Sequence, residues 1–156
     1  MQLNKRTPCV GICSTTYGDL VCRGCKRFAH EIVQWNGYDE TQQDAVRERL
    51  TRLRDEILEA LLVCEEPSLL QAALSEAGLT DFAQKEGLYQ LLRFMVRREQ
   101  SLAIAGLALS AGAIAQPEPS NQPTPELDTL HAMQLLDAES YRRAKAHYER
   151  NFKVPA

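Results

Sequence analysis

Four cysteines between residues 9 and 25 constrain the fold of this 156-residue chain more than any other feature. They occur as two close pairs, Cys9-x3-Cys13 and Cys22-x2-Cys25, with eight residues between the pairs. Each pair can supply two sulfur ligands from one short turn, and a structural zinc ion takes four such ligands at about 2.3 Å. The spacing therefore predicts that these four cysteines bind one metal centre.

The identity of the metal is open at this point. Zinc accepts four thiolates in a tetrahedral site that is closed to substrate, and we prefer it on that ground. An iron–sulfur cluster is the alternative, although ferredoxin-type sequences space their four cysteines differently. The fifth cysteine, Cys64, lies on the apolar side of a predicted helix. We expect it to be a small buried residue and not a ligand.

The sequence around the cysteines predicts a small treble-clef-like knuckle. A glycine inside each pair permits a tight turn. Gly18-Asp19, between β-favouring residues, predicts a minimal hairpin or a tight loop in the eight-residue spacer. A short helix is expected over residues 26–35, because three apolar residues recur on one face: Phe28, Ile32 and Trp35. The second pair would then lie at a helix N-terminus, where the helix dipole favours thiolate.

The remainder of the chain is predicted to be mainly α-helical. Apolar periodicity favours helices over residues 39–64, 68–78, 80–100 and 125–151. Capping boxes are expected at the start of the first two, at Asp39–Gln42 and Ser68–Gln71. The Ala/Gly-rich segment 102–115 either continues the third helix or follows a break near Ser101. Its apolar residues must be buried internally or against a partner.

These elements suggest a division into four parts. Residues 1–38 would form the metal-binding module, and residues 39–115 a helical region. Residues 116–125 contain four of the seven prolines and are expected to be a linker. Residues 126–156 would hold a C-terminal helix.

Two features of the sequence favour a cytoplasmic setting. The N-terminus lacks the apolar core of a secretory signal, and no stretch reaches the length of about eighteen apolar residues that spans a bilayer. In a reducing compartment, clustered cysteines are more often metal ligands than disulfides.

Positive charge is concentrated near the cysteines. Residues 1–54 carry nine Lys/Arg against six Asp/Glu, although the whole chain has a formal charge of −3. Three of the cations, Arg23, Lys26 and Arg27, could contact phosphates, which leaves a nucleic-acid-binding finger open. We prefer the interpretation that they neutralise a zinc–thiolate centre, whose net charge is near −2.

The residues around the cysteines also carry a family signature: Pro8-Cys9-Val-Gly11-Ile-Cys13, Gly18-Asp19, Cys22-Arg-Gly24-Cys25-Lys-Arg27, Glu31-Ile32 and Trp35-Asn36. From about Pro8 to Leu53 the chain resembles small bacterial proteins grouped as domain of unknown function 1289. Members of that family are commonly labelled predicted iron–sulfur proteins. The resemblance implies a four-cysteine metal module of unassigned role. It does not extend over residues 64–156.

No recognisable catalytic arrangement accompanies the cysteines. The sequence has no Ser/His/Asp arrangement, phosphate-binding glycine loop or His-Glu-x-x-His motif. We therefore predict a non-enzymatic metal-binding adaptor that presents a helical surface to a protein partner, with segment 102–115 as the candidate contact. The alternatives are an iron–sulfur redox or iron-sensing protein and a nucleic-acid-binding zinc finger.

Overall fold

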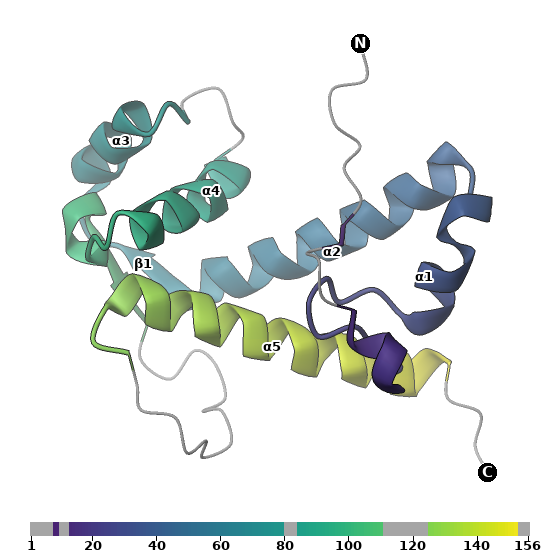
Figure 1. Ribbon diagram of the computed structural model, residues 1–156. Helices are drawn as coiled ribbons and strands as arrows, with labels where there is room; N and C mark the ends of the chain where they lie inside the picture. Colours follow the sequence, from purple (N-terminus) through teal and green to yellow (C-terminus); the bar gives the residue numbers. More distant parts are fainter. Residues whose placement is uncertain (1–7, 10–12, 80–83, 111–124, 153–156) are drawn as a thin grey trace. The chain divides into compact units, whose positions relative to one another are not determined.

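The structure is a computed structural model that describes residues 8–9, 13–79, 84–110 and 125–152. These residues form mostly helices and one two-stranded antiparallel sheet, which confirms the predicted mainly α class (Figure 1). The described elements are 3-10 helices at Ser14–Tyr17, Trp35–Gly37 and Leu102–Ala105, helices α1 (Ala29–Gln34), α2 (Glu40–Leu61), α3 (Pro67–Glu76), α4 (Gln84–Arg97) and α5 (Asp128–Asn151), and strands β1 (Leu62–Cys64) and β2 (Leu107–Leu109).

The chain divides into two compact units. Unit 1 contains Met1–Arg52 and Ser140–Ala156, and unit 2 contains Leu53–Glu139. The boundaries fall inside α2 and α5, so each of these long helices contributes residues to both units. The last turns of α5 therefore belong to the same unit as the four cysteines, although the two are far apart in the sequence.

In unit 2, the apolar faces of the helices surround one leucine-rich core. Its most deeply buried members are Ile57, Leu58, Leu61, Leu91, Leu92, Met95, Leu102, Ala105 and Ala132. Burying one such leucine, isoleucine or methionine side chain contributes about 1.5–3 kcal/mol. The periodic apolar positions of the sequence thus define this core.

The segment after α4 follows the second of its two predicted courses, because the helix breaks before Ser101. Helix α4 ends at Arg97, and residues 102–109 form a 3-10 turn followed by β2. Leu102, Ala105 and Leu107 are buried inside unit 2, whereas Ile104 is exposed. Most of the described apolar surplus therefore belongs to the core of the protein, and residues 111–115 lie outside the described residues.

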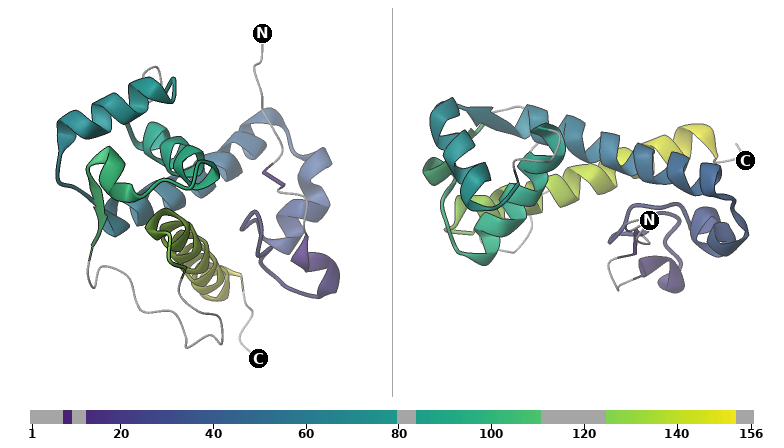
Figure 2. Two further views of the ribbon diagram at one scale, coloured as in Figure 1. Left: turned by 60° about the vertical axis from the view of Figure 1, so that its left-hand side comes forward. Right: turned by 90° about the horizontal axis from the view of Figure 1, so that it is seen from above.

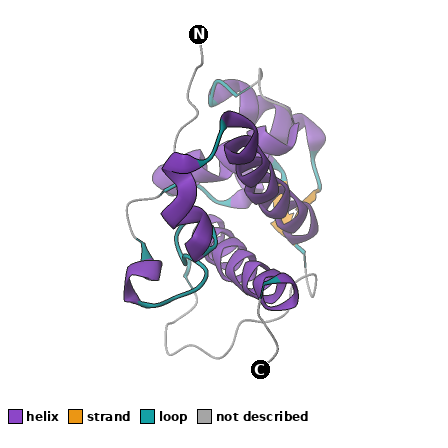
Figure 3. Ribbon diagram, turned by 90° about the vertical axis from the view of Figure 1, so that its right-hand side faces the viewer, coloured by secondary structure: helices purple, strands orange, loops and turns teal. Residues whose placement is uncertain are grey.

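The small sheet was not predicted. Strand β1 directly follows α2 and pairs with β2, with Val63 opposite Ala108 (Figure 3). Helix α2 therefore ends at Leu61 and does not reach residue 64. Cys64 is exposed on β1, so the prediction that it is a buried residue of a helix is wrong.

The two predicted capping boxes have different outcomes. At the start of α2, the Gln42 N–H donates to Asp39 Oδ1 at 2.8 Å, and the Asp39 N–H donates to Gln42 Oε1 at 2.9 Å. This box is confirmed. The box at Ser68 is wrong, because α3 begins with Pro67 and has Glu66 at its N-cap. Proline at the first helical position already supplies the required backbone angle and lacks the N–H that a cap would satisfy.

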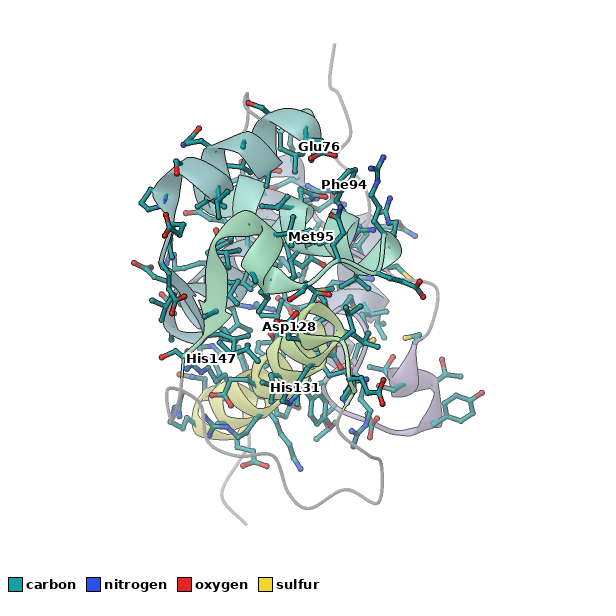
Figure 4. The ribbon with its side chains drawn as sticks, turned by 90° about the vertical axis from the view of Figure 1, so that its left-hand side faces the viewer. Glu76, Phe94, Met95, Asp128, His131 and His147 are labelled. Atoms are coloured by element: carbon teal, nitrogen blue, oxygen red, sulfur yellow. The ribbon has the colours of Figure 1, made fainter. Side chains whose placement is uncertain are left out.

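The start of α5 is fixed by a charged side chain that sequence reasoning did not single out (Figure 4). Asp128 Oδ1 accepts a hydrogen bond from the Leu102 N–H at 2.9 Å, and its Oδ2 accepts one from Ser101 Oγ at 3.1 Å. The neighbouring Thr129 hydroxyl donates to the carbonyl of Gln100 at 2.9 Å. These bonds fasten the first turn of α5 to the 3-10 segment within unit 2.

No helix in the described parts of the chain is both long enough and apolar enough to cross a membrane.

Candidate metal centre

The four predicted ligands occupy different environments in unit 1. Cys22 and Cys25 are buried, Cys13 is half-buried and Cys9 is exposed. Residues 10–12, which connect the first pair, lie outside the described residues. Among the residues that are described, no three His, Cys, Asp or Glu side chains are arranged as a metal site. The structure thus brings the second pair together without assembling all four sulfurs.

The second pair lies in a tight loop between two short extended segments. Val21 and Phe28 form an antiparallel bridge on either side of it. Inside this bridge, the Cys22 N–H donates to the Arg27 carbonyl and the Lys26 N–H donates to the Cys22 carbonyl, both at 2.9 Å. Extended pairing therefore flanks the second cysteine pair.

The spacer between the pairs does not form the predicted hairpin. Residues Ser14–Tyr17 form a 3-10 helix that ends at Gly18, where φ is +99°. Glycine adopts this left-handed conformation without the steric cost that a side chain would bring. The predicted hairpin is wrong because the turn at Gly18 terminates a helical turn and does not join two strands.

Backbone N–H groups surround the Cys22 sulfur. Burial alone would raise the pKa of this thiol, but hydrogen bonds from the N–H groups of Cys25, Ser14 and Gly24, together with the Cys25 thiol, lower its pKa to about 7. The Ser14 N–H lies directly after Cys13, and Ser14 Oγ also accepts a hydrogen bond from the Arg23 N–H at 2.8 Å. This contact joins the end of the first pair to the turn of the second.

Cys25 has a different environment. Burial raises the pKa of its thiol, although Arg27 Nε donates to Cys25 Sγ at 3.3 Å and opposes the rise. The predicted support from a helix N-terminus is wrong, because α1 begins at Ala29, after three intervening residues. The guanidinium of Arg27 stabilises negative charge on this sulfur instead.

Two cations of the loop point inward. Lys26 is 7% exposed and Arg27 is 4% exposed. The Lys26 Nζ donates to the carbonyls of Arg23 and Gly24, and its backbone has a φ of +66°. The Arg27 guanidinium lies 4.8 Å from the centre of the Trp35 ring. Neither side chain is therefore positioned to contact a phosphate at the surface, and of the three candidate cations only Arg23 is exposed.

The chemistry of this loop fits a metal-bound thiolate pair. A thiolate ligand carries negative charge that hydrogen-bond donors and nearby cations stabilise. Cys22 has three backbone N–H donors, and Cys25 has a guanidinium donor. Gly24 and Cys25 of the loop supply two of the backbone donors, and Ser14, next to Cys13, supplies the third.

Residues 7–57 match the family described as protein of unknown function (DUF1289). This confirms the resemblance suggested by the cysteine signature, and the matched segment contains all four cysteines. The comparison with curated proteins found no match to the chain, and the comparison with solved structures found none.

An ion pair between a buried carboxylate and a half-buried guanidinium joins α1 to α2 inside the DUF1289 segment. Glu31 is 4% exposed, and Arg49 Nη1 and Nη2 donate to its two carboxylate oxygens, each at 2.6 Å. Glu31 Oε1 also accepts the Phe28 N–H at 2.9 Å. Burial acts to raise the Glu31 pKa, but the hydrogen bonds from Arg49 and Phe28 and the charge of Arg49 outweigh it and hold that pKa below its ordinary value.

This pair fixes the bend between the two helices, which Figure 2 shows from two directions. Helix α1 is shorter than the predicted helix over residues 26–35, and the chain continues as a 3-10 turn over Trp35–Gly37. The Trp35 ring packs beside the guanidinium groups of Arg27 and Arg47, at 4.8 and 5.3 Å from its centre. The sequence predicted that Trp35 shares an apolar face with Phe28 and Ile32. It did not reveal the Glu31–Arg49 pair, because those two residues are eighteen positions apart.

The two units carry formal charges of opposite sign. Unit 1 contains thirteen Lys/Arg and seven Asp/Glu, a formal charge of +6, whereas unit 2 contains five and fourteen, a formal charge of −9. The positive excess around the DUF1289 segment is larger than the sequence alone suggests, because the basic end of α5 joins the same unit.

Proposed function

We propose that this chain is a non-enzymatic, cytoplasmic metal-binding adaptor. One metal ion, with zinc preferred, would be held by Cys9, Cys13, Cys22 and Cys25, and the folded module would present a helical surface to a protein partner. The observation that carries the proposal is the Cys22–Cys25 loop, in which backbone N–H groups and Arg27 stabilise charge on two adjacent sulfurs. A metal in this position would be structural, with no open coordination site for a substrate.

The small core of unit 1 gives such a metal a role in folding. Among the described residues of unit 1, the buried apolar ones are few: Val21, Cys22, Cys25, Phe28, Val46 and Ala144. A core of this size supplies little folding free energy, whereas the binding of a structural zinc ion is coupled directly to folding. The metal would order the first pair against the loop that already holds the second.

Metal content of the full chain tests the proposal. The protein is purified without oxygen and its zinc and iron are measured per chain. We expect one zinc, lost when Cys13 or Cys22 is replaced by serine. Cys64→Ser is the matched control, because Cys64 lies in unit 2 and should leave the metal content unchanged. A metal-free wild-type protein, or equal metal in Cys22→Ser and wild type, would refute the proposed site.

The same purification decides between the two metals. An iron–sulfur protein would be coloured and would contain iron with acid-labile sulfide in place of zinc. That result would favour the redox or iron-sensing alternative.

The nucleic-acid alternative has less support from the geometry, because Lys26 and Arg27 are buried. It predicts salt-dependent binding to single- or double-stranded DNA or RNA that Arg23→Glu weakens. The absence of binding at moderate salt would remove it.

Within segment 102–115, Leu102, Ala105 and Leu107 are buried in the core of unit 2 and are therefore not available to a partner. We therefore propose that the partner contacts unit 1, which contains the last turns of α5.

A further inference from the structure

Unit 2 contains a cavity that the proposed metal site does not use. Its volume is about 260 Å³, and the residues that line it all belong to Leu53–Glu139. Helices α2, α3 and α4 and both strands contribute to its wall. Most of that wall is apolar and consists of six leucines: Leu58, Leu62, Leu70, Leu74, Leu88 and Leu107. An apolar cavity of roughly 150 Å³ can bind benzene, so this one has room for a larger apolar group.

The cavity reaches from the leucine core to the surface of unit 2. Leu58, Leu74 and Leu107 are buried members of that core. Glu59 and Cys64 line the same cavity and are exposed. An amphiphilic ligand would therefore place its apolar group against the leucines and keep its polar group at the exposed edge.

The polar part of the wall is acidic. Asp55 and Glu59 both line the cavity from α2, and they are four residues apart, so their side chains lie on one side of that helix. None of the described residues that line the cavity is Lys, Arg or His. Arg54 Nε lies 3.5 Å from Asp55 Oδ1 and offsets part of its charge, while the Arg54 guanidinium packs over the Tyr89 ring at 4.0 Å. The wall therefore favours a cation over an anion, and the formal charge of −9 on unit 2 acts in the same direction.

We propose that this cavity binds a small amphiphilic cation, with its alkyl or aryl group among the leucines and its ammonium group beside Asp55 and Glu59. Burial of the apolar group supplies most of the affinity, and the two carboxylates select the charge of the head group. Like charges one helical turn apart repel each other, and a bound ammonium group would relieve that repulsion. The inference does not rest on the metal site, because none of the four candidate metal ligands belongs to unit 2.

Three probes with the same alkyl chain and different head groups test this inference. Octylammonium, octanol and octanoate are titrated into the full-length protein, below the concentrations at which they form micelles, and binding is followed by isothermal titration calorimetry. We expect octylammonium to bind at least tenfold more tightly than octanoate, because the carboxylates attract the first head group and repel the second. Octanol should lie between them. Methylammonium, which has the head group without the chain, should not bind measurably.

Alkylation of Cys64 shows whether the bound probe occupies the cavity. Cys64 is an exposed residue of the cavity wall, and the tryptic peptide of residues 55–85 contains no other cysteine. Iodoacetamide is added with and without octylammonium, and the modified peptide is measured by mass spectrometry. A bound octyl chain should slow the modification of Cys64.

Substitutions separate the role of the carboxylates from that of the leucines. The double variant Asp55→Asn, Glu59→Gln should lose the preference for octylammonium over octanoate but still bind octanol. Leu70→Phe reduces the volume of the cavity and should weaken the binding of all three probes. Glu76→Gln is the matched control, because it removes one acidic charge from an exposed position of α3 outside the cavity wall. If circular dichroism shows that the double variant does not fold, Glu59→Gln alone replaces it, since Glu59 is exposed.

Several results would overturn the proposal. Octanoate binding as tightly as octylammonium would refute the selection of a cation. Unchanged alkylation of Cys64 at saturating octylammonium would place the probe elsewhere on the protein. If Glu76→Gln reduces the preference for octylammonium as much as the double variant does, the net charge of unit 2 explains that preference and the two carboxylates do not. The absence of binding by all three probes would refute the site itself.

Discussion

Replacing Arg49 with methionine tests how the bend between α1 and α2 is held. The change removes two short hydrogen bonds to Glu31 and leaves an apolar side chain of similar length beside Phe28. The Glu31 carboxylate is then left with the Phe28 N–H as a remaining donor. We expect unit 1 to lose stability, because a buried carboxylate without its counter-charge is costly.

The expected loss of stability follows from how deeply the Glu31 and Arg49 side chains are buried. Removing one partner of a fully buried pair costs about 3–5 kcal/mol. The Glu31 side chain is 6% exposed, but Arg49 is 33% exposed, so water screens part of the interaction. We therefore expect Arg49→Met to lower the free energy of unfolding by about 2–3 kcal/mol.

Arg52→Met is the matched control. Arg52 lies on the same helix and pairs with Glu48 at 2.9 Å, but the two side chains are 67% and 71% exposed. Such a surface pair contributes less than about 0.5 kcal/mol. Both variants are unfolded in urea and followed by the emission of Trp35, the single tryptophan, which lies in unit 1. Equal midpoints for the two variants would refute the assigned role of the buried pair.

The pH dependence gives a second measure of the same pair. The pKa of Glu31 is lower in the folded protein than in the unfolded chain, where it is about 4.3. Its contribution to stability is therefore complete above the unfolded value and is lost as the pH falls through the folded value. In Arg49→Met, the free energy of unfolding should therefore fall less steeply as the pH is lowered. If the variant loses stability at acidic pH just as the wild type does, the assignment of the pKa shift to Arg49 is contradicted.

Three further predictions concern other parts of the molecule. Gly106→Ala should destabilise unit 2 by about 3 kcal/mol or more, because a Cβ there would lie 2.4 Å from the Glu66 carbonyl oxygen. Gly78→Ala is the control: Gly78 has a similar φ but open space around it, so the change should cost only about 1 kcal/mol. Asp128→Ala should cost about 2 kcal/mol in urea unfolding, since two hydrogen bonds to the 3-10 segment are lost. Chelation of the proposed metal should shift Trp35 emission, and an unchanged spectrum after complete metal removal would argue against metal-coupled folding.

The sequence determined the features that depend on local pattern. The apolar periodicity and the Asp39–Gln42 capping box gave α2 nearly to its end, because both signals act within a few residues of each other. The resemblance carried by the cysteines and the residues around them also agrees with the family match over residues 7–57. The mainly α class follows from the same kind of signal.

Only the tertiary structure decided which distant residues meet. Residues 62–64 leave the helical pattern because they pair with 107–109, more than forty positions away, and Gly106 permits this approach by lacking a side chain. The end of α5 joins unit 1 through aromatic contacts with Phe28 that no local spacing encodes. Helix caps and cysteine pairs involve residues close in sequence, so they can be predicted from the sequence alone. Strand pairing and the burial of Phe28 by α5 depend instead on the free energy of the whole packed structure.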